Sequence, residues 1–277
     1  MIVLIRLKIK LLSLFSLNKA GNELFRLFIT PIKPIHIYKS KIFCKYEEVS
    51  FMLKGKKING YRCPIAGEKK ALILHGFGST LHKFENFVEP LMKNGWEVLA
   101  FDAPAHGDSE GKTVHAVDYA DMILEVIQRF GPIGLFIGHS FGGLAVSLAL
   151  EKISLPNAKI ILIAPATETT SAIDEAMKVL GIKSNKLKNA LEETIFRKSG
   201  KPAKWYSVKR AVHNIKNPIL WIHDELDTIT PIDDVWEIKN EHLPNIQFYI
   251  TKGLGHRHIY KDESVLKMVI RFANNPL

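Results

Sequence analysis

The spacing of apolar positions changes along the chain and divides it into regions of different expected secondary structure. From residue 71 onward, short runs that are apolar throughout alternate with longer stretches of helical periodicity. Fully apolar strands separated by helices are typical of a parallel sheet covered on both faces. The pattern predicts strands at 71–75, 96–101, 133–137, 159–163, 218–223 and 246–250. It predicts helices at 81–93, 114–130, 140–152, 232–242 and 259–273.

A hairpin precedes this alternation, and a helical segment interrupts it. Residues 43–53 and 56–63 alternate around a Lys54-Gly55 turn, which predicts two antiparallel strands. Residues 166–213 contain no strand-like run, only helical stretches at 171–180 and 185–198 and a weaker one at 203–212. We therefore expect an arm (1–42), one α/β core (43–165 and 214–277) and a helical cap inserted at 166–213.

The arm begins with an apolar segment whose pattern matches neither a membrane-spanning helix nor a signal peptide. Residues 1–17 are strongly apolar but contain Arg6, Lys8 and Lys10, and charges at the centre of a membrane-spanning helix are costly. A signal peptide would place its basic residues first, whereas this chain opens on Met-Ile-Val-Leu-Ile. An amphipathic helix remains, which either packs on the domain, the favoured alternative, or lies on an anionic membrane surface. We expect a cytoplasmic protein, with peripheral membrane contact through the arm left open.

Charge and cysteine content narrow the classes of partner. The net charge of the 277 residues is +10, of which +8 falls within residues 1–45. A nucleic-acid-binding protein more often spreads basic residues over a folded face, so we expect no nucleic-acid partner. Cys44 and Cys63 are too few for a disulfide framework or a metal site, and two reduced thiols are favoured over one bridge.

A candidate nucleophile lies where the strand at 133–137 meets the next helix. Gly138-His139-Ser140-Phe141-Gly142 places a serine between two glycines. In such a strand–turn–helix corner, side chains at the flanking positions would clash, and the serine hydroxyl is lifted out of the sheet. The alternative is a glycine-rich helix start that Ser140 caps.

A serine nucleophile needs a base, and the base needs an orienting carboxylate, both expected where later strands end. Asp227 follows the strand at 218–223 and is the favoured acid; Asp224 is the runner-up, and capping of the next helix is the alternative role for both. After the last strand, Gly255 precedes His256, which is the favoured base over His258.

The loop after the first parallel strand is expected to stabilise the oxyanion and to contact the substrate. The residues His75-Gly76-Phe77-Gly78 allow the backbone to approach the nucleophile, and we assign oxyanion stabilisation to the amides of Phe77 and Phe141. We expect four residues to lie against the substrate: His75, Gly76, Gly78 and His139.

Taken together, these motifs resemble the α/β-hydrolase family over about residues 71–272. The matching segments are 75–78, 101–109 (Phe-Asp-Ala-Pro-Ala-His-Gly-Asp-Ser) and 138–143, followed by Asp227 and His256 in the family's order Ser, Asp, His. The resemblance implies an eight-stranded, mostly parallel sheet with a cap after the sixth strand. It also implies hydrolysis through an acyl-enzyme, without metal or organic cofactor. Ala105, where many relatives have Gly, is a departure in a structural turn.

Three functions are compatible with these residues. The first is a serine hydrolase that cleaves an ester, a thioester or a similar acyl bond of a small-molecule substrate, with an apolar acyl group. The second is an acyltransferase on the same triad, and the third is a non-catalytic binding protein of this fold. Ser140 argues against the epoxide hydrolases and haloalkane dehalogenases of the fold, which use an aspartate. The oligomeric state is left open.

Other motifs are incomplete. Gly111-Lys112-Thr113 lacks the upstream glycine of a phosphate-binding loop, a position that His106 occupies. No Gly-x-Gly-x-x-Gly follows a strand, and neither His-Glu-x-x-His nor Cys-x-x-Cys occurs. For His106 and Asp108, a structural turn is favoured over metal ligation.

Overall fold

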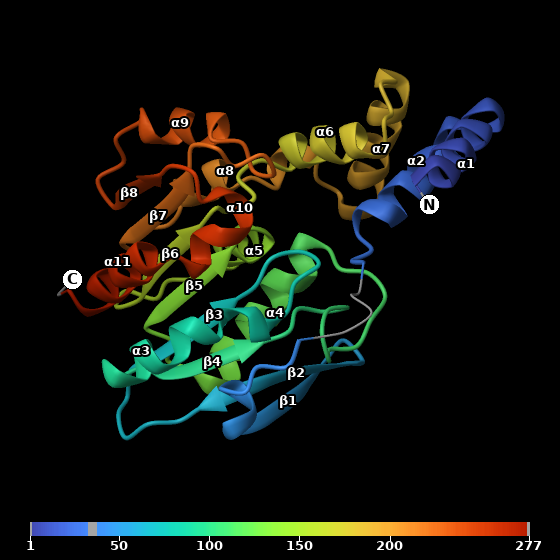
Figure 1. The fold of residues 1–277 in the computed structure, drawn as a ribbon. Coiled ribbons are helices and arrows are strands. Elements are labelled where there is room, and N and C mark those ends of the chain that lie inside the picture. The colour runs from blue at the N-terminus through green and yellow to red at the C-terminus, as the bar shows by residue number, and fades with distance from the viewer. Residues whose placement is uncertain (1, 33–37, 276–277) are drawn as a thin grey trace.

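The computed structural model describes residues 2–32 and 38–275, and its centre is one eight-stranded sheet (Figure 1). The strand order is β1-β2-β4-β3-β5-β6-β7-β8. The β1–β2 and β2–β4 pairs are antiparallel and the other five pairs are parallel, which confirms the predicted mostly parallel sheet. The strands are β1 (Glu47–Leu53), β2 (Lys56–Cys63), β3 (Lys70–Leu74), β4 (Glu97–Phe101), β5 (Leu135–His139), β6 (Lys159–Ile163), β7 (Ile219–Asp224) and β8 (Ile246–Thr251).

Helices cover both faces of the sheet, and the side chains of each strand alternate between two apolar clusters. Leu72 and Leu74 of β3 belong to the cluster under α4 (Ala116–Phe130) and α5 (Phe141–Leu150). Ala71 and Ile73 belong to the cluster under α3 (Val88–Lys93) and α11 (Glu263–Asn274). This double burial explains why the central strands are apolar at every position. The short helices α9 (Asp233–Lys239) and α10 (Gly255–His258) flank β8 in the sequence.

Several element boundaries differ from the expected ones. Residues 43–45 form the 3₁₀ helix η1 (Phe43–Lys45), so β1 begins only at Glu47. The Ser40 hydroxyl accepts hydrogen bonds from the amides of Ile42 and Phe43 and so stabilises this turn. The expected helix at 81–93 begins as the 3₁₀ helix η2 (Leu81–Phe87), and the strand expected at 133–137 lies two residues later.

The segment predicted as a cap is helical and follows β6. It contains α6 (Thr169–Val179), α7 (Asn185–Ser199), the 3₁₀ helix η3 (Ala203–Trp205) and α8 (Val208–Val212). α6 and α7 extend away from the sheet, while α8 returns beside α5 (Figure 1).

The arm forms two helices, α1 (Ile2–Phe15) and α2 (Leu17–Phe28), where the sequence predicted one. α2 packs along α7, and a Cβ at Gly21 would lie only 2.3 Å from the Ala190 carbonyl oxygen. Phe25 of α2 also stacks on His115, with ring centroids 5.5 Å apart, and the Ile29 carbonyl accepts the Val114 amide at 2.9 Å. The arm therefore contacts both the cap segment and the loop before α4. Among the described residues, no helix has the length and apolar character that crossing a membrane requires. Both cysteines are free thiols, Cys44 exposed and Cys63 buried.

Candidate active site

Ser140 occupies a strained corner between β5 and α5. Its φ is +52°, in the left-handed region that non-glycine residues rarely adopt. A Cβ at Gly142 would lie 2.5 Å from the Leu74 carbonyl oxygen, and one at Gly138 would lie 2.9 Å from the Gly142 carbonyl oxygen. The flanking glycines are therefore a steric requirement of the turn.

Three side chains from distant parts of the sequence meet at this corner. The Ser140 Oγ lies 3.0 Å from His256 Nε2, and His256 Nδ1 lies 2.7 Å from Asp227 Oδ2. Ser140 follows β5, Asp227 lies in the loop after β7, and His256 lies on α10 after β8. The carboxyl ends of parallel strands share one edge of a sheet, which brings the three together. Nδ1 of His256 donates to the carboxylate, leaving Nε2 to accept the serine proton.

Hydrogen bonds hold the Asp227 carboxylate in its ionised form. Oδ1 accepts the amides of Ile229 and Thr230 at 2.8 and 2.9 Å, and Oδ2 accepts the Thr230 hydroxyl at 2.9 Å. Burial raises the pKa of Asp227, but the hydrogen bond and charge of His256 and the two amides outweigh it, so the pKa lies below its usual value. Asp227 thus stays charged beside His256.

The two runner-up residues have other surroundings. Asp224 Oδ2 accepts the Thr251 hydroxyl at 2.7 Å and the Leu254 amide at 2.9 Å, and so fixes the loop that leads to His256. It is therefore a support of the loop rather than a partner of the imidazole. His258 lies exposed at the end of α10.

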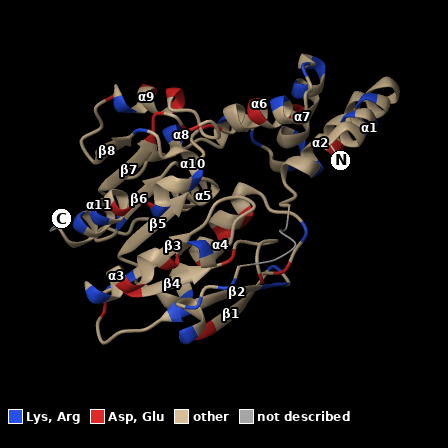
Figure 2. Cartoon of the chain, viewed as in Figure 1, with Lys and Arg blue, Asp and Glu red and all other residues tan. Residues whose placement is uncertain are grey.

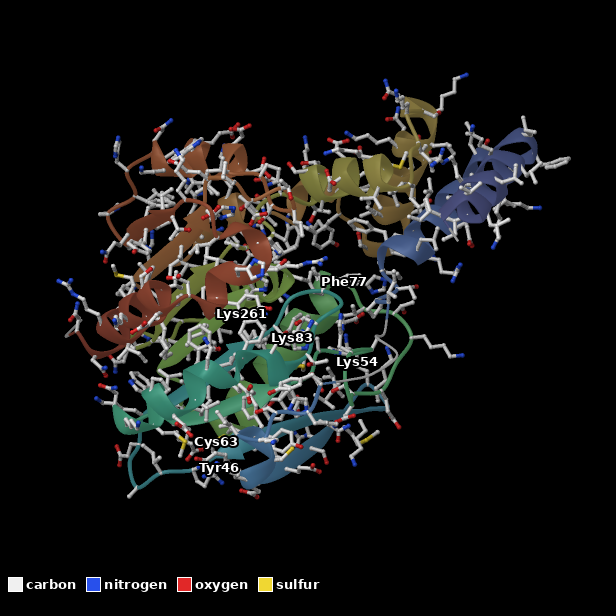
Figure 3. All side chains as sticks on the ribbon, viewed as in Figure 1. Tyr46, Lys54, Cys63, Phe77, Lys83 and Lys261 are labelled. Carbon is white, nitrogen blue, oxygen red and sulfur yellow. The ribbon has the colours of Figure 1, made fainter. Side chains whose placement is uncertain are left out.

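The two amides assigned to the oxyanion lie beside Ser140. A Cβ at Gly76 would be 2.9 Å from the Ser140 Cβ, so the backbone that leads into Phe77 passes directly against the nucleophile. The rings of Phe77 and Phe141 meet edge to face with centroids 5.7 Å apart, and Phe77 projects from the loop after β3 (Figure 3). Within residues 2–32 and 38–275, neither amide has a hydrogen-bond acceptor. Both donors are therefore free to bind a developing negative charge.

His75 does not lie where a substrate contact was expected. It is fully buried; Nδ1 donates to the Gly76 carbonyl at 2.8 Å and Nε2 accepts the Ala103 amide at 2.9 Å. Burial lowers the pKa of His75 to about 4, so the ring is neutral and ties two loops together. The Gly78 amide donates to His106 Nε2 at 2.9 Å, so Gly78 and His106 also support the loop.

His139, also expected to lie against the substrate, is buried and packs against His256. Its Nε2 donates to the main-chain carbonyl of His256 at 3.1 Å, and the two rings lie 4.8 Å apart. Burial, followed by the nearby His256, lowers the pKa of His139 to about 3. Nδ1 of this neutral ring is buried without a hydrogen bond in the described structure.

Thr230 is a site residue that the sequence analysis missed. Its hydroxyl lies 2.9 Å from Asp227 Oδ2 and 3.2 Å from His256 Nδ1, so it contacts both members of the acid–base pair. Behind it, Nε2 of the buried His223 donates to the Thr230 carbonyl at 2.8 Å. The only signal in the sequence is a threonine three residues after Asp227 and directly before Pro231.

Comparison with known proteins gives one consistent family. The sequence model of the family described as "Serine aminopeptidase, S33" matches residues 67–207. A Mycoplasma pneumoniae protein named as an esterase/lipase is 24% identical over 238 residues, which cover 74% of this chain and 88% of that protein. Rat monoglyceride lipase is 27% identical over 128 residues, which cover 43% of this chain and 42% of the lipase.

Solved structures of esterases share the fold. The Pyrococcus furiosus esterase Pf2001 aligns with a TM-score of 0.66 and 21% identity, covering 88% of this chain and 96% of the esterase. Est1E from Butyrivibrio proteoclasticus, solved with ferulic acid bound, aligns with a TM-score of 0.64 and 21% identity, covering 81% and 97% of the two chains.

Proposed function

Because the chain belongs to the serine aminopeptidase S33 family of α/β-hydrolases and is a hydrolase of the esterase/lipase type, we propose that it cleaves a carboxylic ester or a related acyl bond through an acyl-enzyme on Ser140. The single observation that carries this proposal is the continuous hydrogen-bonded chain from Ser140 through His256 to Asp227. That chain joins a nucleophile, a base and an orienting carboxylate in the order that acyl transfer needs.

In the first step, the Ser140 hydroxyl attacks the carbonyl carbon while His256 Nε2 takes its proton. Asp227 stabilises the imidazolium, and the Phe77 and Phe141 amides bind the carbonyl oxygen as it becomes negative. His256 then gives the proton to the leaving oxygen or sulfur as its bond to the acyl carbon breaks. An alcohol or thiol leaves, and the acyl group stays on Ser140.

In the second step, water attacks the acyl carbon with His256 as the general base, and collapse of the intermediate returns the proton to Ser140. The product is a carboxylic acid. An acyltransferase would follow the same path with another alcohol or thiol in the place of water. A non-catalytic protein would have no need for the strained φ of Ser140 together with two free amides beside it.

The rings around Ser140 favour an apolar acyl group. Phe77 and Phe141 adjoin the nucleophile, and Tyr119 packs against Phe141 with ring centroids 5.6 Å apart. Phe77 is 41% exposed, so its ring has apolar area left to cover. A hydrocarbon chain over this ring removes that area from water.

A panel of p-nitrophenyl esters from acetate to laurate tests the proposal. We expect the wild type to hydrolyse one or more of them and Ser140→Ala to lose the activity while its melting temperature is retained. Added alcohols or thiols show whether the acyl group passes to water or to another acceptor. Absence of turnover of every ester by the folded wild type, or turnover by Ser140→Ala, would overturn the proposal.

A further inference from the structure

The helix α1 carries an apolar face that the rest of the described protein leaves uncovered. Six of its large apolar side chains are between 50% and 85% exposed. They are Val3, Leu4, Leu7, Leu11, Leu14 and Phe15. Contiguous exposed apolar surface of this kind marks an interaction site in most soluble proteins.

This face is separate from the face by which α1 is anchored. Ile9 is fully buried, and Ile5 and Leu12 pack on the same apolar cluster. Arg6 Nε donates to the Leu180 carbonyl at 2.8 Å, which fastens α1 to the end of α6. At about 100° per residue, the exposed residues span an arc of about 120° on the side opposite Ile9. Packing against α2 and the cap therefore fixes α1 with its second apolar face outward.

Two lysines border the exposed arc. On the same helical projection, Lys10 lies at one edge of the arc and Lys8 at the other, and α1 contains no acidic residue. Figure 2 shows basic residues without acidic ones along this helix. Lys8 is 2.8 Å from Glu23 of α2, whereas Lys10 forms no ion pair within the described residues. Lysines at the edges of an apolar stripe can extend their ammonium groups toward anionic headgroups.

We propose that this face of α1 docks the protein on the surface of an anionic phospholipid bilayer. Its 14 residues span about 21 Å as a helix, enough to lie along the interface and too short to cross it. The apolar arc would enter the boundary between headgroups and acyl chains, and Lys8 and Lys10 would stay at the level of the phosphates.

A second copy of this chain suits the face less well than a bilayer does. Two such faces packed together would bring the lysine borders of one helix against those of the other; α1 contains no acidic residue, and only Lys8 is compensated, by Glu23 of α2. α1 also lies at the outer edge of the molecule, beyond α7 and away from the sheet (Figure 1). It can therefore meet a flat surface before the body of the protein does.

Co-sedimentation with vesicles tests the proposal without relying on esterase activity. We expect the full chain to bind vesicles of equal parts phosphatidylcholine and phosphatidylglycerol, and to bind phosphatidylcholine alone much more weakly. The double variant Leu7→Gln, Leu11→Gln should bind at least tenfold more weakly. Lys10→Gln should weaken binding about fivefold, the effect of one basic residue near an anionic surface. Met52→Gln, which removes a 57% exposed apolar side chain of β1, is the matched control and should bind as the wild type does.

Several results would overturn the proposal. One is failure of the folded wild type to sediment with anionic vesicles at millimolar lipid; another is unchanged binding by the double variant. Dimerisation in light scattering that depends on Leu7 and Leu11, without vesicle binding, would identify a second copy as the occupant. Ser140→Ala should bind vesicles normally, so failure of the hydrolase proposal and failure of this one are distinguishable.

Discussion

Replacing Asp227 by Asn tests how the base is oriented. Oδ1 of Asp227 accepts two main-chain amides, so the Asn carbonyl oxygen should take that position rather than set an NH₂ group against two donors. The NH₂ group then takes the position of Asp227 Oδ2, which lies 2.7 Å from His256 Nδ1 in the wild type. This arrangement favours the imidazole tautomer that carries its proton on Nε2. Such an imidazole cannot accept the proton of Ser140.

The expected loss is large and specific to catalysis. The same change in the triad of a serine protease lowers kcat about 10⁴-fold, and we expect a similar factor here, equal to about 5.5 kcal/mol of activation free energy. The fold loses one charge-assisted hydrogen bond, a cost of about 1.5–3 kcal/mol in unfolding free energy. The protein should therefore remain folded at 25 °C while its activity falls close to that of Ser140→Ala.

Asp224→Asn is the matched control, since the sequence left these two acids as alternatives. Asp224 accepts the Thr251 hydroxyl and the Leu254 amide, so the change should lower the melting temperature but alter kcat less than tenfold. The assay is kcat on the preferred p-nitrophenyl ester, paired with thermal unfolding of each variant. If Asp227→Asn keeps more than a tenth of the wild-type kcat, or Asp224→Asn shows the 10⁴-fold loss, the reasoning is wrong.

Three further changes test other parts of the structure. Thr230→Val removes the hydroxyl that donates to Asp227 Oδ2, so kcat should fall about tenfold with little change in KM; an unaltered kcat would show that the hydroxyl is dispensable. Burial lowers the pKa of His75 to about 4, so the unfolded chain binds more protons between pH 6.5 and 4, and stability is lost as the pH falls through that window. The difference in unfolding free energy between pH 7 and 4.5, measured in urea, should be about 2 kcal/mol larger for the wild type than for His75→Gln; equal differences would contradict the burial of His75 as a neutral ring. Gly142→Ala would set a Cβ 2.5 Å from the Leu74 carbonyl oxygen and should destabilise the protein severely. Gly55→Ala, at a φ of +75° with open space around it, should lower the free energy of unfolding by only about 1–2 kcal/mol. Equal melting temperatures of the two variants would refute the steric argument.

The sequence predicted the sheet because the parallel strands lie in a doubly buried layer. Every residue of β4, β5, β6 and β7 is buried, so apolar side chains recur without alternation and the strands stand out from the helices. Boundaries were less predictable. The η1 turn before β1 depends on the Ser40 hydroxyl, a local hydrogen bond that periodicity does not register.

The candidate triad was also accessible to sequence reasoning, because strand-end loops gather at one edge of a parallel sheet. The choice between Asp224 and Asp227 depended on hydrogen bonds that only the fold reveals. Thr230 and His139 contact His256 across segments far apart in sequence, so neither the threonine after Asp227 nor the histidine before Ser140 indicates that contact by itself. His75 was expected at the substrate because it adjoins a loop of the site, but its ring turns into the core.

The arm shows a further limit of the sequence. Periodicity indicated an amphipathic N-terminal helix but not its partner, because the partner surface on α7 is itself a product of folding. Gly21 enables the close approach of α2 to α7, and a lone glycine in a helical pattern has no single meaning in advance. One side of α1 is packed against the rest of the protein, while the opposite side remains uncovered, so the two alternatives for the helix do not exclude each other.

Labelling with a fluorophosphonate, followed by mass spectrometry of the intact protein and its peptides, tests the central claim most directly. The probe phosphonylates a serine only where a base and an oxyanion site activate it. We expect one adduct per chain, on the peptide that contains Ser140, and none on Ser140→Ala. A folded wild type that stays unlabelled, or an adduct on any other residue, would contradict it.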